Sequence, residues 1–553
     1  MDGSESKNRV GHYFLIFALL TILLAPNLFL YFQNVLVLKL SYSTRILIRL
    51  IFAFIFFTIP LIFKFVNLRY YFYLLSPLIL VSPIAFVTVY LYDILPTKWI
   101  MLGVLQTNKD EAVEFLRGFE WLAFATLFFF TGYIFVIKFW MPKRVLISFL
   151  TKRLFIAGAG LFTLLIVGWT IHLHGYKNIS GHLYKRVLTL SYPFGLIHNT
   201  IQAYTELDDF NDVRFEDFSF QAFQRDTIGS RRISIVILGE SSRYSNWGVN
   251  GYYRDTSPNM ARRTNIITFS DMISPVPLTG LSLPLILTRA TPESHDALYT
   301  EKSFLTAFKE AGYKVYWISN QPAELSTIRF INEADSYITL AGKGLFDESL
   351  LTSVKEAINS NNQNVLIVVH TQGSHYNYAK RFPKEFNVYT PSTMNSNENS
   401  KSIENGDLIM NSYDNTILYT DFVINKTIEL VENESWVASV IYLSDHGEII
   451  FDGNLDKLGH GIGTPSRYVY HIPFLFWYSD LFELKYADKI RSAKLNENDP
   501  ISTINFFHSI LDLNQITVNN EENSKSIFSN SYVKRPRKVM VREDELVDYD
   551  DIP

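Results

Sequence analysis

The stretch SIVILGESSRYSNWGVNGYYRDTSPNM, residues 234–260, decides the fold of the second half of the chain. Four apolar residues, Ile235 to Leu238, predict a short buried strand, and Gly239 and Glu240 follow it directly. A carboxylate in this place either caps the next helix or is delivered by the strand to a reaction centre. The rest of the sequence has to decide between these two interpretations.

Short apolar runs alternate with helix-like segments from Ile233 onward. Gly312 lies where a helix is expected to end and a strand to begin. The runs are ISIVIL, SFLTAFKEAGYKVYWIS, VLIVVH and WVASVIYLSDHGE. This alternation predicts an α/β domain with a mainly parallel sheet.

Three of the apolar runs end on residues that bind metals. The first ends on Glu240, the second on His370 with His375 close behind, and the third on Asp445 and His446. In open α/β sheets, functional groups gather beyond the carboxyl ends of the strands. Carboxylate oxygens together with an imidazole nitrogen suit a tetrahedral zinc-type site with one open position. The pair Asp445-His446, between a strand and a glycine, favours function over packing.

The segment TFSDMISPVPLTGLSLPLIL, residues 268–287, places a hydroxyl where it could react. Thr279 opens an apolar segment that can be helical, although Pro284 weakens that interpretation. The hydroxyl is either an ordinary helix cap or a nucleophile at a helix amino terminus, where backbone N–H groups favour a phosphate. Further on, His460 stands between two glycines and is a functional candidate, whereas His471 is interpreted as packing.

The first third of the chain predicts a membrane anchor. The chain is 48% hydrophobic and 15% aromatic with a net charge of −4, which argues against disorder and gives no reason to expect a nucleic acid partner. Five apolar runs are each long enough to cross a bilayer, and acids are absent from inside them, so an ion pathway is not expected. They are Tyr13–Phe32, Ile46–Phe63, Tyr71–Tyr92, Trp121–Trp140 and Leu154–Leu173.

Basic residues set the expected orientation of this anchor. Lys7 and Arg9 precede the first run, and others crowd the links between the second and third and the fourth and fifth runs. The positive-inside rule then places the amino terminus in the cytoplasm. We therefore expect a multi-pass protein of the bacterial inner membrane with a transmembrane domain over 1–175, a juxtamembrane connector over 176–232 and a periplasmic catalytic domain over 233–553. The chain has no cysteine, so this exported domain has no disulfides and depends on its core, a metal, or both.

Taken together, these motifs resemble the membrane-anchored phosphoethanolamine transferases of the alkaline phosphatase and sulfatase superfamily. The resemblance is carried by GESSRYSNWGVNGYYRDTSP, LTGLSLP, HTQGSHYNYAKRFP, YDNTILYTD, YLSDHGE and GHG. It implies a five-helix transmembrane bundle followed by an α/β alkaline-phosphatase-like domain with a mainly parallel central sheet.

The resemblance also implies the chemistry. One zinc would be held by Glu240, Thr279, Asp445 and His446, with Thr279 as the nucleophile that takes phosphoethanolamine from phosphatidylethanolamine. A cell-envelope glycan or lipopolysaccharide would then accept the group. His375 and His460 would contact the phosphate, move protons or bind a second zinc, and Asn320 would lie near the phosphoethanolamine. Ser241 and Ser242 are interpreted as loop structure.

The resemblance also narrows the acceptor. Family members that modify lipid A usually carry disulfides, which this chain cannot form, and WISNQ resembles members that modify lipopolysaccharide core or periplasmic glucans.

Three alternative functions compete with this interpretation. A sulfatase would need a Cys/Ser-x-Pro-x-Arg pattern, which the segment after Thr279 lacks. A phosphoglycerol transferase similar to lipoteichoic acid synthases differs only in the donor headgroup and is the main alternative. A scaffold with a structural zinc is disfavoured, because such sites are usually closed and rich in cysteine.

Overall fold

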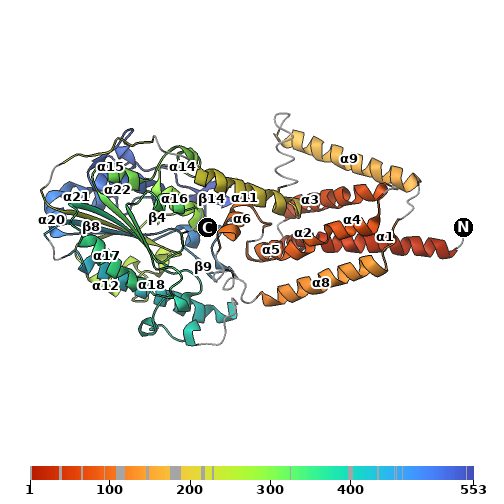
Figure 1. Cartoon of the computed structure of the whole chain (residues 1–553), viewed down its shortest axis with the longest axis horizontal. Helices are drawn as coiled ribbons and strands as arrows, with labels where there is room; N and C mark the ends of the chain where they lie inside the picture. Colours follow the sequence, from red (N-terminus) through yellow and green to blue (C-terminus); the bar gives the residue numbers. More distant parts are fainter. Residues whose placement is uncertain are drawn as a thin grey trace. The chain divides into compact units, whose positions relative to one another are not determined.

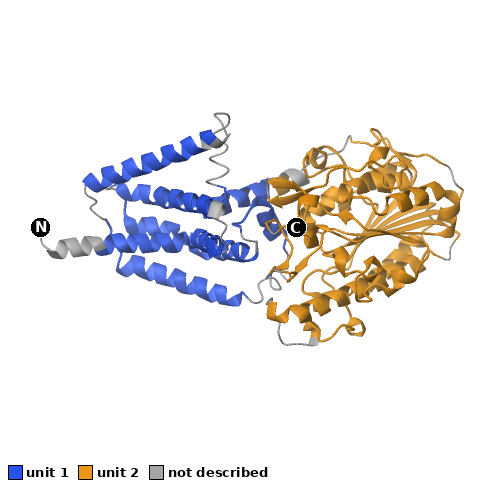
Figure 2. Cartoon of the chain, turned by 180° about the vertical axis from the view of Figure 1, so that it is seen from behind, with its two compact units in different colours: residues 1–205 blue, residues 206–553 orange. Residues whose placement is uncertain are grey.

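The computed structural model describes the residues 3–36, 40–63, 66–92, 94–107, 112, 119–144, 149–174, 189–212, 218–226, 229–323, 326–395, 403–432, 435–453, 455, 457–463, 465–542 and 545–552. They form two compact units, one over 1–205 and one over 206–553 (Figure 2). The unit boundary falls inside the expected connector 176–232, part of which lies outside the described residues, so the connector's limits stay a prediction.

The first unit is helical. Its helices are α1 (Gly3–Leu23), α2 (Ala25–Leu36), α3 (Leu40–Thr58), α4 (Leu68–Leu75), α5 (Pro77–Tyr92), α6 (Lys98–Gln106), α8 (Glu120–Phe139), α9 (Phe149–His174) and the start of α11 (Phe194–Asp212). Four described segments are long and apolar enough to cross a membrane: 43–62, 68–91, 120–139 and 149–169.

The first predicted crossing is a bent pair of helices. The helical stretches 11–23 and 25–36 meet at 72°, and a count of five holds only if they form one crossing. Pro26 lies at the break and has no N–H to continue the helical ladder, which explains the bend. The count of five crossings therefore stays a prediction.

The second unit is built on a seven-stranded sheet, as the alternating runs predict. Its strand order is β3-β11-β8-β2-β7-β5-β6. The strands are β3 (Ile266–Phe269), β11 (Phe474–Tyr478), β8 (Val437–Ser444), β2 (Arg232–Gly239), β7 (Asn364–His370), β5 (Lys314–Ser319) and β6 (Ser336–Thr339). The five strands from β8 to β6 pair in parallel, and only the β11 pairings are antiparallel.

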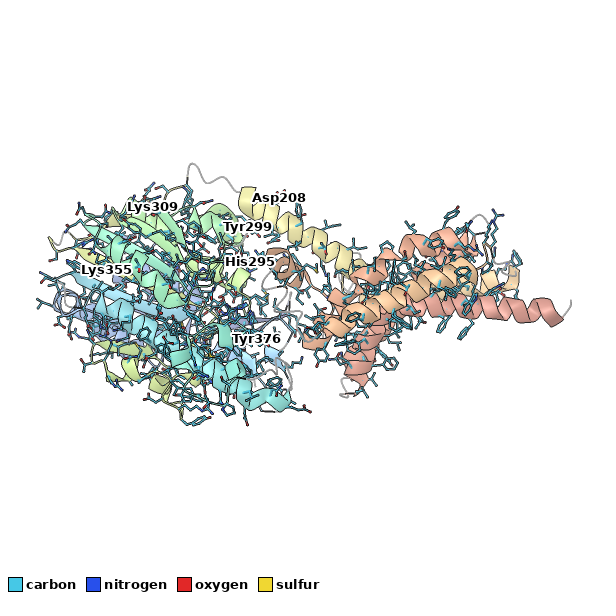
Figure 3. The ribbon with its side chains drawn as sticks, turned by 60° about the horizontal axis from the view of Figure 1, so that its bottom comes forward. Asp208, His295, Tyr299, Lys309, Lys355 and Tyr376 are labelled. Atoms are coloured by element: carbon cyan, nitrogen blue, oxygen red, sulfur yellow. The ribbon has the colours of Figure 1, made fainter. Side chains whose placement is uncertain are left out.

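Helices cover both faces of this sheet (Figure 1). One face carries α14 (Asp296–Thr300), α15 (Phe304–Glu310) and α22 (Phe506–Leu513); the other carries α12 (Pro258–Arg262), α17 (Leu350–Ile358) and α18 (Gly406–Glu429). Lys309 on α15 and Lys355 on α17, both labelled in Figure 3, are exposed to solvent. Strands β2 and β8 are buried along their whole length, which matches the continuous apolar runs that parallel central strands require.

The remaining elements are short. They include α13 (Thr279–Leu287), α16 (Ile328–Ile331), α19 (Arg467–Tyr470), α20 (Asp480–Lys485) and α21 (Ala487–Asn496), and two-stranded ribbons of β1 (Phe223–Gln224) with β13 (Ile516–Thr517), β4 (Met272–Ile273) with β12 (Ile501–Ser502), β9 (Ile449–Ile450) with β10 (Leu458–Gly459), and β14 (Lys538–Arg542) with β15 (Glu545–Asp548).

Candidate metal and nucleophile site

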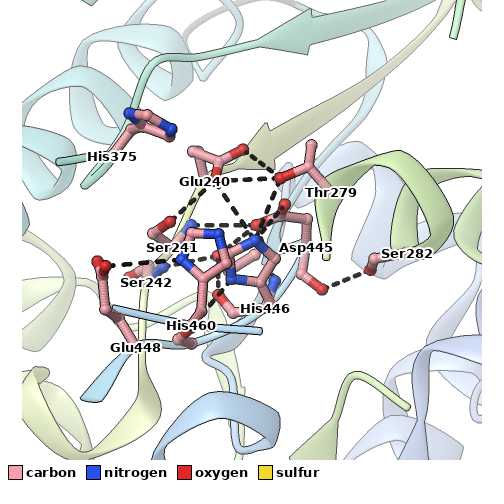
Figure 4. Close-up of polar contacts among 12 residues, drawn as sticks. Glu240, Ser241, Ser242, Thr279, Ser282, His375, Asp445, His446, Glu448 and His460 are labelled. Carbon is pink, nitrogen blue, oxygen red and sulfur yellow. Dashed lines mark hydrogen bonds and ion pairs between the residues drawn. The ribbon is translucent and has the colours of Figure 1, made fainter. Parts of the chain in front are cut away.

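Glu240, Asp445 and His446 come together beyond the carboxyl ends of β2 and β8 (Figure 4). The two strands pair in parallel with Gly239 opposite Ser444, so the next residue of each strand enters the same space. One ligand atom from each of the three side chains lies within 4.8 Å of the others, and all three residues are buried. Strand register therefore explains why residues two hundred positions apart form one cluster.

Thr279 completes the cluster from a different element. It is the first residue of α13, as the sequence predicts, and this helix continues through Pro284. Its Oγ1 lies 3.1 Å from His446 Nε2 and 3.2 and 3.3 Å from the two Glu240 carboxylate oxygens. Ligand atoms bound at ~2.0 Å around a tetrahedral centre stand about 3.3 Å apart, so these separations suit a shared metal ion.

The His446 ring is oriented for ligation. Its Nδ1 lies 2.9 Å from the Gly447 carbonyl and donates to it, which leaves the Nε2 lone pair facing the cluster. Burial lowers the pKa of His446, but the charges of Asp445 and Glu240 outweigh burial and raise that pKa above its ordinary value. A metal cation bound among these groups would replace the second proton of the His446 ring.

The donor set fits a zinc-type ion. Asp445 uses Oδ1 to accept the backbone N–H of Ser241 at 3.0 Å and of His446 at 2.7 Å. Its Oδ2 is buried, accepts no hydrogen bond and lies 3.2 Å from His446 Nε2. A buried carboxylate oxygen without a donor is costly unless a cation binds it. Two carboxylates, one imidazole and one hydroxyl make the oxygen and nitrogen set expected for zinc.

Ser241 and Ser242 shape the loop, as expected. Ser241 has a φ of 54° and its hydroxyl donates to Glu240 Oε1 at 2.8 Å. The hydroxyl of Ser242 accepts the indole N–H of Trp247 at 2.9 Å, and its own N–H donates to Ser444 at 2.8 Å. Both serines therefore hold the first turn after β2, whereas the Thr279 hydroxyl lies within 3.3 Å of both Glu240 and His446.

His460 lies beside the cluster. Its ring centroid is 4.0 Å from that of His446, and its Nδ1 is 3.6 Å from the carboxylate of Glu448 (Figure 4). Glu448 is buried and comes from the same SDHGE motif as Asp445 and His446. The Glu448 carboxylate therefore lies close enough to the His460 ring for an electrostatic interaction.

His375 stands apart from the cluster in Figure 4. Its Nδ1 lies 2.6 Å from the Tyr376 carbonyl, and Arg381 donates to the His375 carbonyl at 2.9 Å. Burial, together with the nearby charges of Arg381 and His460, lowers the pKa of His375 to about 4 against the opposing effect of Glu240. His375 is therefore neutral at ordinary pH.

Asn320 is buried at the end of β5. Its amide nitrogen donates to the Leu345 carbonyl at 2.9 Å and to Asp347 Oδ1 at 3.0 Å, while its Oδ1 accepts no hydrogen bond. The amide group is thus held by the scaffold through its nitrogen, and only its oxygen is left for a ligand.

The structure shows two further residues, not indicated by the sequence motifs, that hold Glu240 and the loop after β7 in place. The Gln321 amide donates to Glu240 Oε2 at 3.3 Å and to the Thr371 carbonyl at 2.7 Å. Asp347 accepts the backbone N–H groups of Gln372 and Gly373, each at 3.0 Å, besides the amide of Asn320. The only sequence signal for Gln321 is its place directly after a strand end, and Asp347 carries none.

Comparison with known families now identifies the second unit. The family described as Sulfatase matches residues 232–516, which is just over half of the chain. The chain belongs to the sulfatase family. The matched range runs from the first residue of β2 past every residue of the cluster.

Several curated relatives of this sulfatase-family chain are named phosphoethanolamine transferases. The chain is 26% identical over 351 residues to phosphoethanolamine transferase EptC of Escherichia coli K12, covering 60% of this chain and 59% of the relative. It is 31% identical over 296 residues to phosphoethanolamine transferase EptA of Helicobacter pylori, covering 51% and 53%. The family resemblance expected from the motifs is confirmed, although the chain spans only 53–59% of these relatives' length.

Solved structures show the same architecture. The integral membrane phosphoethanolamine transferase EptA from Neisseria meningitidis matches 94% of this chain and 98% of its own at a TM-score of 0.74 and 22% identity. The zinc complex of the C-terminal periplasmic domain of EcEptC from Escherichia coli matches 60% of this chain and 96% of its own, with a TM-score of 0.53 and 23% identity. The predicted fold, apolar helices followed by an alkaline-phosphatase-like domain with a mostly parallel sheet, is confirmed.

Proposed function

We propose that this chain is a zinc-dependent phosphoethanolamine transferase of the bacterial inner membrane with its catalytic domain in the periplasm. The donor is phosphatidylethanolamine, and the acceptor is a cell-envelope glycan or lipopolysaccharide. The observation that carries the proposal is the Thr279 hydroxyl, which lies 3.1–3.3 Å from His446 and Glu240 at the start of a helix. The names of the relatives supply the phosphoethanolamine group.

The residues divide into ligands and a nucleophile. Glu240, Asp445, His446 and the Thr279 oxygen would hold one zinc. That ion, when bound, would lower the pKa of the hydroxyl and offset charge on the phosphate. Helix α13 begins at Thr279, and the positive end of a helix dipole favours a phosphate bound beside this residue.

The reaction follows in two displacements at phosphorus. In the first, the Thr279 hydroxyl loses its proton and Oγ1 forms a bond to phosphorus, while the bond to the diacylglycerol oxygen breaks and that oxygen takes up a proton. In the second, an acceptor hydroxyl loses its proton and its oxygen bonds to phosphorus, while the bond to Thr279 Oγ1 breaks and Oγ1 takes up a proton. His460, which lies 3.6 Å from Glu448, would move these protons. Neutral His375 would contact the transferring group or, with His460, hold a second zinc.

Mass spectrometry on the full-length chain tests this function. The protein is incubated with vesicles that contain phosphatidylethanolamine, or with vesicles that contain phosphatidylglycerol, and the peptide with Thr279 is analysed. We expect a phosphoethanolamine group on Thr279 with the first vesicles only. Thr279→Ala removes the adduct, and Thr291→Ala, a threonine outside the cluster, keeps it. A phosphoglycerol adduct, or an unmodified Thr279 beside an adduct elsewhere, would contradict the assignment.

A further inference from the structure

A cavity lies one layer away from the cluster, and the catalytic proposal assigns it no role. Its volume is about 540 Å³, within the ~300–1,000 Å³ usual for small-molecule sites. It is lined by Tyr252, Tyr253, Phe451 and Tyr468, with Arg243 and carboxylates. We call it the tyrosine pocket.

The aromatic walls are held in place before any ligand binds. The Tyr252 hydroxyl donates to buried Asp414 at 3.0 Å, and the guanidinium of Arg254 lies 5.3 Å from the Tyr253 ring. Tyr253 is nevertheless 78% exposed, which leaves an open face toward solvent. An aromatic ring that is both rigid and exposed offers contact area at little entropic cost.

The opposite wall is fixed in the same way. Tyr468 is 36% exposed, and the guanidinium of Arg243 lies 4.8 Å from its ring. Phe451 has a φ of 53°, a backbone conformation that a bulky side chain rarely adopts and that is found most often at functional sites. The surrounding structure thus accepts strain in order to present Phe451 at this position.

Charge among the described lining residues disfavours a phosphate and favours hydroxyl groups. Among these residues Arg243 is the one cation, and it is buried in an ion pair with Asp452 at 2.5 Å. Glu404, just before α18, and Asp407, in its first turn, are exposed and add two further carboxylates. An anion would be repelled here, whereas sugar hydroxyls can donate to carboxylates.

The pocket adjoins the reaction centre through Arg243. This arginine follows Glu240 by three residues, and its Nη1 donates to the Glu448 carbonyl at 3.2 Å. The Glu448 carboxylate in turn lies 3.6 Å from His460. A ligand in the pocket is therefore separated from the cluster by the layer of Arg243 and Glu448.

We infer that the tyrosine pocket binds a sugar ring of the acceptor. This inference rests on the proposed function, because it names the chemical class of the acceptor for that reaction. The flat C–H face of a pyranose packs against the electron-rich faces of Tyr253 and Tyr468, and its hydroxyls donate to Glu404 and Asp407. The donor headgroup, with its phosphate, binds at the cluster and leaves the pocket to the acceptor.

Two measurements on the full-length chain test the pocket. The first is direct binding of two soluble probes, a short gluco-oligosaccharide and the deacylated saccharide of lipopolysaccharide. The second separates formation of the Thr279 adduct from its transfer to either probe. We expect Tyr253→Ala to weaken binding and transfer about five- to tenfold while adduct formation is unchanged. Tyr253→Phe keeps the ring and should behave as the wild type, as should Tyr337→Ala, an exposed tyrosine outside the pocket.

The outcomes separate this inference from the proposed function. Equal loss of adduct formation and transfer in Tyr253→Ala would assign the pocket to the donor and overturn the inference. Unchanged binding and transfer would overturn it as well. If the wild type forms no adduct from any donor, the proposed function fails. The binding titration alone then tests whether the tyrosine pocket binds a sugar. Saturable sugar binding that Tyr253→Ala weakens still supports the pocket, and no saturable binding of either probe refutes it.

Discussion

The backbone of Gly373 lies directly against the backbone of Glu240. A Cβ atom added at Gly373 would stand 2.8 Å from the Glu240 nitrogen and 2.9 Å from its carbonyl oxygen. The next residue, Ser374, donates its N–H to that same carbonyl at 2.9 Å. The HTQGSH loop after β7 therefore supports the first turn after β2, and glycine is needed where the two chains meet.

Replacing this glycine should displace Glu240. In Gly373→Ala the new methyl group can be accommodated only if the backbone that carries Glu240 moves. We expect adduct formation on Thr279 to fall about tenfold to a hundredfold, because small shifts of reacting groups are costly. The rate of adduct formation, measured by mass spectrometry on folded protein, checks this.

Gly342→Ala is the matched control for this variant. Gly342 has a φ of +73°, compared with +50° for Gly373, and a Cβ there would meet nothing within 4 Å. Both variants strain the backbone, by about 1–2 kcal/mol for a side chain in the left-handed region. An equal loss of adduct formation in the two variants would show that backbone strain, and not contact with Glu240, causes that loss.

Much of this arrangement could be predicted from the sequence, because the apolar runs that end on Glu240, Asp445 and His446 mark both the strands and their functional ends. The sequence could not show that β8, β2 and β7 are neighbours in that order. Adjacency is set by how the helices pack, and no short stretch of sequence records it. Pro284 gave a misleading signal, since α13 continues through it.

The supporting residues could not be predicted. Asp347 lies in an unremarkable polar segment, and its role becomes visible only when the loop after β7 folds back onto it. His375 belongs to the HTQGSH segment, but the sequence does not place this loop relative to Thr279. Contacts between loops depend on several chain reversals at once, and this is why they escape motif-based prediction.

Removing the charge of Asp347 should loosen that loop. The carboxylate accepts three N–H groups, and burial raises its pKa despite them. Asp347→Asn turns one accepting oxygen into an NH₂ group that faces another donor, and we expect a loss of about 1–3 kcal/mol in stability. Thermal unfolding measures this. Asp488→Asn, at an exposed carboxylate on α21, is the control and should leave the midpoint unchanged.

Zinc content tests the ligand set independently of catalysis. We expect the full-length chain to bind zinc through Glu240, Asp445 and His446, so Glu240→Gln or His446→Asn should lower the bound metal at least tenfold. Elemental analysis after dialysis against limiting zinc gives the content. Glu483→Gln, an exposed carboxylate on α20, should retain the metal. Full zinc occupancy in both cluster variants would exclude this site as the place where zinc binds.

Chelation should also lower the unfolding temperature of the wild type. A metal that binds only the folded chain stabilises it by mass action. Removing the metal leaves the buried Asp445 Oδ2 without a cation and without a hydrogen-bond donor. Re-addition of zinc should restore the midpoint in the wild type and in Glu483→Gln, but not in Glu240→Gln. A midpoint that chelation leaves unchanged in the wild type would contradict a stabilising metal in this unit.

His508 on α22 should make stability depend on pH. It is buried, and burial with the charges of Lys525, Arg289 and Arg535 lowers its pKa to about 3, against the opposing effect of Glu522. Below about pH 6.5 the unfolded chain takes up a proton at this residue that the folded chain does not, so stability falls as pH falls. The slope contributed by one such group approaches about 1.4 kcal/mol per pH unit. We expect the unfolding midpoint to drop between about pH 7.5 and pH 5 more steeply in the wild type than in His508→Phe. Parallel curves for the two proteins would show that His508 titrates alike in the folded and unfolded chain, and that its burial among three cations does not exclude the proton.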